Sequence, residues 1–356
     1  MKRYFIAMAA CAAMLATPAL FAQQPKVSNT QFTTEAVGGN LAGTIERLGH
    51  AQDQIWLGYE VPALPGRHFS SCSAGMDPSE SDDGCCGEFR LEDQNYTNNS
   101  SDRAPVATQI YILYRFDHGQ LVKIRPVIAG CHLNAGGVAF TWLTGVPQEE
   151  SVRYLTQLAT KSQAQTHNKV LDGALMAIGY HAAPDATHAL VQIVSSDAPM
   201  HTREQAAFWL GVMRGHGGFI ALQSLAKQST DAALREKLPF DFSQNSDPAA
   251  EDELVAMAKS DSDTKVREQA LFWLAQKAGK KAVPAITDAI QNDPETDVKK
   301  RAVFALSQLP KDESVPQLIR VADTNSNLAI RKEAFFWLGQ SQDPRALAYL
   351  EQVLKR

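Results

Sequence analysis

Cysteine and histidine are the residues of this sequence whose chemistry depends most on spacing. Beyond the apolar amino terminus the cysteines are Cys72, Cys85, Cys86 and Cys131. In an oxidising compartment an even count favours two disulfides, and three pairings are possible. Because adjacent cysteines form a strained ring, we expect Cys85 and Cys86 to pair outward, one with Cys72 and one with Cys131.

A zinc site is the alternative role for these cysteines, with His68 or His132 as a further ligand. The sequence lacks the Cys-x-x-Cys spacing that is typical of structural zinc sites. Reactive free thiols are a third possibility. Of the three, the sequence favours disulfides, and we predict no metal.

Catalytic motifs are missing from the rest of the chain. Gly-x-Ser-x-Gly, His-Glu-x-x-His and Gly-x-Gly-x-x-Gly do not occur, and Gly279-Lys280-Lys281 has neither the loop nor the following hydroxyl of a phosphate-binding P-loop. The sequence therefore predicts no catalytic residue and no cofactor.

The amino terminus has the layout of a secretory signal peptide. Lys2 and Arg3 precede an apolar run, which small and polar residues follow. We predict a signal peptide over residues 1–22 that is cleaved after Ala22, with cleavage after Ala19 as the alternative. The mature protein is then periplasmic or secreted.

Two other interpretations of this segment remain open. A membrane anchor needs about 20 apolar residues, which is more than this run provides. A lipoprotein would carry its lipid on Cys11, after an apolar stretch of only a few residues. We expect no membrane segment once the signal peptide is removed.

Charge narrows the choice of partner. The chain has 356 residues, with 34 Lys and Arg against 39 Asp and Glu and a net charge of −5. A general nucleic-acid binder needs a basic face, so this balance argues against nucleic acid as a partner.

A repeat dominates the second half. Residues 202–211 recur as 266–275 and 330–339, a spacing of 64, and weaker copies at half that spacing reduce the period to 32. Residues 234–243 are a degenerate copy that carries Pro239 and Asp241. Five columns cover 30 positions, all apolar except Thr202; they begin at Val170, Ala174, Ile178, Leu190 and Ile193.

Each copy predicts a helical hairpin. Three columns follow each other at i, i+4 and i+8 and two at i and i+3, which gives one apolar stripe on each of two helices. A single hairpin cannot bury these stripes, so we predict a solenoid of six hairpins over residues 165–356. The expected N-caps of the first helices are Asp197, Ser229, Asp261, Asp293 and Asn325.

This stretch resembles the HEAT-like repeats of the short type found in phycobilisome lyases, which carry a Val-Arg pair followed by small and leucine columns. The arginine column is Arg203, Arg235, Arg267 and Arg331, with Lys299 in register and Leu171 breaking it. The resemblance implies a protein-binding scaffold; some relatives assist bilin attachment, but no residue here carries that activity. We expect each arginine to bond to nearby carboxylates.

Three tryptophans depart from the family's small residues. Trp209, Trp273 and Trp337 lie within the angle of the buried stripe on a helix of about 100° per residue. We expect them in the core; an exposed aromatic ladder is the alternative.

The first half follows another pattern. Residues 110–116 and 121–125 alternate around a polar turn and predict a β-hairpin, and residues 55–61 predict another strand. We predict a small disulfide-containing β-rich domain over 23–146 with a long polar loop at 76–103, then a connecting helix at 147–164. Residues 131–146 resemble a stretch of a subgroup of secreted bacterial HEAT-repeat proteins.

The predicted function is a non-enzymatic extracytoplasmic scaffold that binds a protein or peptide. The alternative is an enzyme or enzyme-assisting protein with its chemistry in the first half. Expecting second helices on the concave side, we predict partner contacts there. The candidates are Gln192, Lys227, Lys259, Asp288, Arg320 and Gln352.

Overall fold

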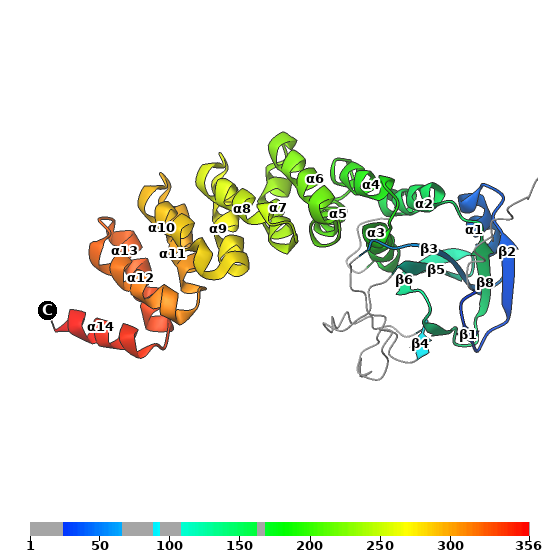
Figure 1. The fold of residues 1–356 in the computed structure, drawn as a ribbon, viewed down its shortest axis with the longest axis horizontal. Coiled ribbons are helices and arrows are strands. Elements are labelled where there is room, and N and C mark those ends of the chain that lie inside the picture. The colour runs from blue at the N-terminus through cyan, green and yellow to red at the C-terminus, as the bar shows by residue number, and fades with distance from the viewer. Residues whose placement is uncertain (1–23, 66–87, 93–107, 162–167, 356) are drawn as a thin grey trace, which may run out of the picture.

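The computed structural model describes residues 24–65, 88–92, 108–161 and 168–355. They form a β-rich amino-terminal part that is followed by an arched row of helices (Figure 1). The predicted fold class, mostly helical with a β-rich first part, is confirmed at this level. The predicted signal peptide at 1–22 lies outside the described residues.

The β-rich part contains two sheets and a helix. Its strands are β1 (Val27–Ser28), β2 (Phe32–Ala36), β3 (Gln54–Pro62), β4 (Glu88–Arg90), β5 (Gln109–Asp117), β6 (Gln120–Ile128), β7 (His132–Asn134) and β8 (Ala139–Thr144). Helix α1 (Leu41–Gly49) follows β2, and α2 (Gln148–Lys161) leads into the helical row.

The larger sheet has the order β2-β8-β3-β5-β6, with β2, β8 and β3 parallel and the last two pairings antiparallel. The predicted hairpin is confirmed, because β5 pairs with β6 around His118 and Gly119, both with positive φ. The small sheet has the order β1-β7-β4.

The two faces of the larger sheet are covered differently. Alternation along β3 directs Trp56 and Tyr59 to opposite faces. The buried Tyr59 hydroxyl is hydrogen-bonded to Ser151 of α2 at 2.9 Å. On the other face, Trp56 donates from Nε1 to Glu92 at 2.7 Å, and Arg125 lies 4.9 Å from the ring centre of Phe89.

The predicted long polar loop is interrupted by β4. Phe89 of β4 lies within the predicted loop range of 76–103, yet its side chain is buried. An apolar side chain at this position can cover one face of the larger sheet. Cys131, the described member of this set, is buried. Cys72, Cys85 and Cys86 lie outside the described residues, so the pairing stays a prediction.

The helical row runs from α3 to α14. Its helices are α3 (Lys169–Tyr180), α4 (Asp185–Val194), α5 (Met200–Met213), α6 (Gly215–Gln228), α7 (Ala232–Gln244), α8 (Ala249–Ser260), α9 (Thr264–Ala278), α10 (Val283–Asn292), α11 (Thr296–Ser307), α12 (Lys311–Thr324), α13 (Leu328–Gln340) and α14 (Pro344–Leu354). Among the described helices, none is both long and apolar enough to span a bilayer.

The predicted N-cap column is two residues too early. Asp261 is the C-cap of α8, and Asp263 caps α9 by accepting from the backbone N–H of Lys265. Asp261 instead accepts from the N–H of Asp263 and forms the turn between the helices. At both positions an Asp carboxylate accepts from a backbone N–H two residues later. The residue type alone therefore did not distinguish the N-cap from the turn.

Three arginines of the column bond to carboxylates, as expected, whereas Arg331 donates to the backbone carbonyl oxygen of Ala322. Arg203 pairs with Asp231 at 2.7 Å, and Arg235 pairs with Asp261. These bonds run from a first helix to the next turn along the row. They therefore fix the spacing between neighbouring hairpins.

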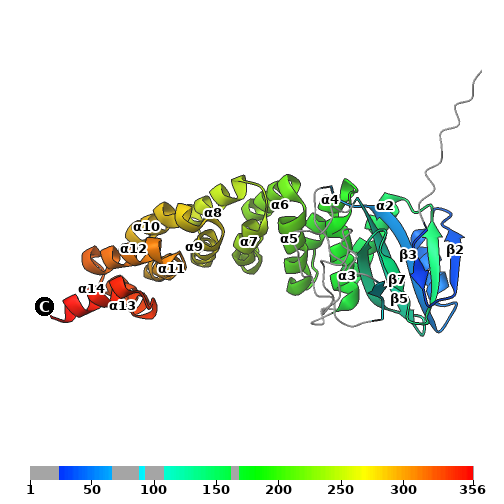
Figure 2. The same ribbon diagram turned by 60° about the horizontal axis from the view of Figure 1, so that its bottom comes forward.

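The first helices line the inner side of the arch. Figure 2 shows α3, α5, α7, α9, α11 and α13 along its lower, inner side and α4, α6, α8, α10 and α12 along its upper side. The expectation that second helices line the concave side is therefore wrong. A Cβ on Gly211 of α5 would lie 2.5 Å from the Asp241 carbonyl oxygen, so small residues let the first helices approach closely.

The sheet and the helical row join at α3. His181 at the end of α3 is buried and bridges to Ala63, and its Nδ1 accepts from the N–H of Ala183 at 3.1 Å. Burial lowers the pKa of His181 to about 4, so the ring is neutral at physiological pH.

The most buried of the arginine pairs should contribute strongly to stability. Arg267 and Asp293 are bonded at 2.8 Å with both side chains buried. Replacing Arg267→Met leaves the carboxylate buried without its partner, and we expect a loss of about 3–5 kcal/mol in the free energy of unfolding. Chemical denaturation followed by circular dichroism measures it.

Arg331→Met is the matched control. Arg331 occupies the same column but donates to the carbonyl oxygen of Ala322 at 2.9 Å, so its loss should cost about 1 kcal/mol. Equal losses in the two variants would contradict a special role for the buried pair.

Candidate functional site

A column of phenylalanines lies on the inner face of the arch. With the period of 32, one ring falls on each of five successive first helices; they are Phe208, Phe240, Phe272, Phe304 and Phe336. Phe208 and Phe240 stack with ring centres 6.0 Å apart and planes within 10°, and Phe272 and Phe304 stack at 5.8 Å and 4°. All five rings keep part of their surface exposed.

Tryptophans connect these stacked pairs. Trp273 lies 4.7 Å from Phe240 and 4.9 Å from Phe272, so it joins one pair to the next. Trp337 lies 5.0 Å from Phe304 in the same way. The tryptophans pack against the core, as predicted, but each also keeps an exposed edge, so they belong to both the core and an aromatic row.

A cavity opens beside this row. It has a volume of about 610 Å³ and lies between α5, α7 and α9. Its walls are His201, Glu204, Gln205, Phe208, Glu236, Lys237, Phe240, Asp241, Gln269 and Trp273. The volume is within the range of small-molecule and side-chain pockets.

Asp241 is the unusual residue of this cavity. It is 2% exposed, and its Oδ2 atom has no hydrogen-bond partner. Burial raises its pKa well above the usual carboxyl range, and the charge of Glu204 raises it further. The structure therefore holds a carboxyl that favours its neutral form at the bottom of an aromatic site.

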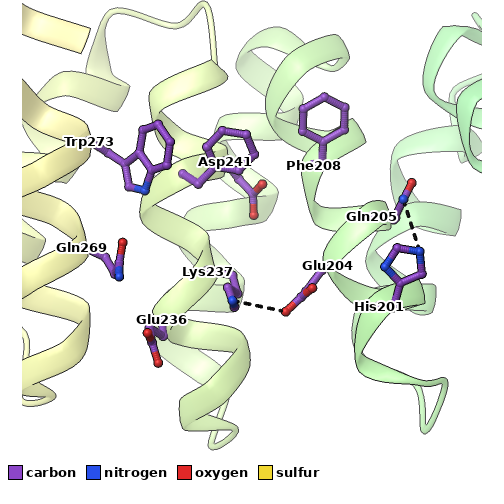
Figure 3. A pocket seen from close by; sticks show the side chains of 10 residues that line it. His201, Glu204, Gln205, Phe208, Glu236, Lys237, Asp241, Gln269 and Trp273 are labelled. Atoms are coloured by element: carbon purple, nitrogen blue, oxygen red, sulfur yellow. Dashed lines mark hydrogen bonds and ion pairs between the residues drawn. The ribbon is translucent and has the colours of Figure 1, made fainter. Parts of the chain in front are cut away.

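Charged and amide groups surround the aromatic walls. Glu204 and Lys237 pair across α5 and α7 at 3.8 Å, and Gln205 is bonded to His201 at 3.4 Å (Figure 3). In Figure 3 Asp241 lies between Trp273 and Phe208, with its carboxyl turned toward α5. The cavity combines aromatic faces with carboxyl groups, a combination that suits a cationic group.

One cation of the chain already uses the aromatic row. The guanidinium of Arg301 on α11 lies 5.2 Å from the ring centre of Phe272 and 4.7 Å from that of Phe304. The stacked pairs of the inner face therefore accept a planar cation.

The predicted partner residues lie on the other layer. Gln192, Lys227, Lys259, Arg320 and Gln352 are exposed, and Asp288 is half-buried, all on second helices. None of the six lines the cavity between α5, α7 and α9. Arg320 instead lines a separate cavity of about 510 Å³ between α10 and α12.

A further cavity of about 240 Å³ lies at the junction of sheet and helices. It is lined by Lys123 and Arg125 of β6 and by Lys169 of α3. Lys123 donates to the carbonyl oxygen of Leu91 at 3.4 Å, and Arg125 donates to the same oxygen at 2.8 Å. Within the described residues, no group of three or more His, Cys, Asp or Glu is placed to hold a metal ion.

Sequence reasoning missed the phenylalanine column although its signal was present. The five positions follow the 32-residue period without a gap. The columns used to establish the repeat were those of the buried stripe, whereas Phe272 lies about 120° from Val266 around the helix. The degenerate copy at 234–243 gave a second signal, because Asp241 stands where three other copies carry Trp209, Trp273 and Trp337.

The fold is an α-helical solenoid of stacked hairpins that follows a β-rich part and packs against its sheet. This is the architecture of a repeat scaffold. Residues 286–356 match the family model of HEAT repeats. The chain is a HEAT-like repeat protein. A search of curated proteins found no significant match.

Three solved structures are similar to parts of this chain at low identity. Human deoxyhypusine hydroxylase in complex with glycerol is 18% identical with a TM-score of 0.31, covering 58% of this chain and 90% of that one. The CpcE–CpcF complex of phycocyanin lyase from Nostoc is 22% identical with a TM-score of 0.33, covering 44% and 99%. Escherichia coli YibA is 19% identical with a TM-score of 0.36, covering 59% and 79%.

Asp241 should make stability depend on pH. In the unfolded chain its carboxyl ionises near its ordinary pKa of 3.8, whereas the folded carboxyl keeps its proton to a higher pH. Between these values the folded state binds more protons, so its stability falls as pH rises. We expect the melting temperature of Asp241→Asn, relative to the parent, to increase from pH 5 to pH 8.

Asp252→Asn provides the comparison, because Asp252 is exposed on α8. Its melting curve should stay parallel to that of the parent over the same range. Calorimetry measures all three proteins, and parallel curves for Asp241→Asn would contradict the buried acid.

Proposed function

We propose that the chain is a non-enzymatic scaffold that binds an extended protein or peptide segment along the inner face of its first helices. The observation that carries this proposal is the continuous aromatic row from Phe208 to Phe336 with its adjoining cavity. Half-exposed rings on a concave surface supply contact area at low conformational cost.

The spacing of the row suits an extended segment. Equivalent rings recur on α5, α7, α9, α11 and α13, so one strand of peptide could meet several of them in turn. Amide and charged side chains accompany the rings in the column that begins at Gln205; it continues as Lys237, Gln269, Arg301 and Glu333. Such polar groups can bond to a peptide backbone beside the aromatic contacts.

An extracytoplasmic location is part of the proposal. It is supported by the signal-like layout of residues 1–22 and by the even cysteine count that follows. In this compartment we expect two disulfides, with Cys85 and Cys86 pairing outward to Cys72 and Cys131.

The non-enzymatic assignment is supported by how charged groups at the sheet are used. At the junction cavity, the nitrogens of Lys123 and Arg125 are bonded to backbone carbonyls beside β4. These bonds tie the small sheet to β6. They account for the basic residues without a reaction.

Peptide selection on the full chain tests the binding face. Random dodecapeptides displayed on phage are enriched on the protein, and the enriched peptides are measured by fluorescence anisotropy. In the inner variant Phe240, Phe272 and Phe304 are each changed to Ala. Because it removes three of the five phenylalanines, we expect its affinity to fall at least about tenfold.

The outer variant is the matched comparison, with Lys227, Lys259 and Arg320 each changed to Glu. It should bind the same peptides as the parent does. If the outer variant alone loses binding, the row on the second helices is the binding surface. Enrichment of no peptide would contradict peptide binding altogether.

A further inference from the structure

We propose that the cavity between α5, α7 and α9 receives an arginine side chain of the bound segment. Its guanidinium would lie over Phe208 and Phe240 and reach the carboxyl of Asp241. This inference rests on the proposed function, because it names the residue type that the inner face selects.

An equivalent pair of rings that is already covered by a guanidinium lies 64 residues later in the chain. A shift of 64 residues turns Phe208 and Phe240 into Phe272 and Phe304, the pair that Arg301 covers at 5.2 and 4.7 Å. The same shift relates Arg301 to Lys237. Lys237 pairs with Glu204 at 3.8 Å, as Figure 3 shows, so the chain's nearest cation is engaged with a carboxylate at this pair of rings.

The two double repeats also differ beneath the rings. Asp241 becomes Ala305 after the shift of 64 residues, and both positions are buried. Where the chain supplies its own guanidinium it therefore has an alanine, and where it does not it has a carboxyl. The carboxyl oxygen Oδ2 is without a partner, which a donor from outside could supply.

The charge of the cavity selects a cation. Its carboxyl groups are those of Glu204, Glu236 and Asp241, against the single ammonium of Lys237. Entry of a cation would give Oδ2 a partner and stabilise the ionised form of Asp241, which burial and Glu204 disfavour. The rings add attraction through their negative faces.

Arginine fits better than lysine. Its guanidinium is planar, weakly hydrated and able to stack on a ring while it donates to a carboxylate at its edge. An ammonium is strongly hydrated and loses more solvation on entering a half-closed aromatic site. The stacked arrangement of Phe208 and Phe240, within 10°, offers a flat platform of the kind that Arg301 uses.

Short peptides test this assignment directly. The probes are acetylated, amidated pentapeptides of alanine with a central arginine, lysine, citrulline or leucine, titrated into the full chain by NMR and tryptophan fluorescence. We expect the arginine probe to bind at least fivefold more tightly than the lysine probe. The citrulline and leucine probes should not compete with it.

Variants locate the bound guanidinium. Phe240→Leu and Asp241→Asn should each weaken the arginine probe at least fivefold. Lys237→Arg keeps the charge but supplies an internal guanidinium at the position of Arg301, so it should also weaken the probe. Asp252→Asn, which removes an exposed carboxylate on α8 outside the cavity, should leave the affinity unchanged.

The outcomes separate this inference from the proposed function. Equal binding of all four probes, or arginine binding that Phe240→Leu and Lys237→Arg leave unchanged, overturns the arginine site. Selected peptides that depend on the inner face but not on any arginine would overturn it too, while the scaffold function stands. Each variant is compared with the parent in melting temperature before titration.

Discussion

The first hairpin of the helical row cannot bury its apolar stripe against a preceding hairpin, so the sheet must cover it. This contact is made backbone to backbone. A Cβ on Gly173 of α3 would lie 2.1 Å from the carbonyl oxygen of Ile124 on β6, so only glycine allows the approach. The sheet therefore serves as the cap that a solenoid needs at its end, and each later hairpin is positioned by the one before it.

The same close approach, repeated along the row, creates the inner face. Gly179 lies against Trp209, and Gly211 lies against the backbone at Asp241, so first helices approach closely. Arg203 and Arg267 tie successive hairpins together through carboxylates at the turns. Aromatic side chains that face the narrowed gaps then contact each other across helices, and they remain partly exposed on the inner face.

The period and the apolar stripes of the fold could be predicted because they depend on neighbours within one helix. The β-hairpin around His118 was predictable for the same reason, since alternation and a polar turn specify it locally. Which helices form the inner face could not be predicted, because the curvature of the row arises from small differences in spacing between two layers of helices. Asp261 shows a further limit, since a carboxylate serves a C-cap turn as well as an N-cap.

The tryptophan column shows why the cavity lies where it does. Along successive first helices this column alternates large and small side chains: Ala177, Trp209, Asp241, Trp273, Ala305 and Trp337. Each tryptophan packs toward the previous hairpin, whose residue in this column is small. The ring centre of Trp273, for example, lies 4.7 Å from that of Phe240. At the positions that alternate with the tryptophans the side chain must be small, and alanine meets this steric requirement.

Asp241 satisfies those steric requirements but adds a polar group that the neighbouring copies lack. A buried carboxyl without a hydrogen-bond partner lowers the stability of the folded state relative to an alanine at the same position. Proteins keep such locally unfavourable residues mainly where a ligand interaction offsets the loss. Pro239 and Asp241 mark this copy as the least regular of the repeat, and the cavity between α5, α7 and α9 lies beside it. The irregular copy is therefore the place on an otherwise periodic surface where one side chain of a partner can be distinguished from its neighbours.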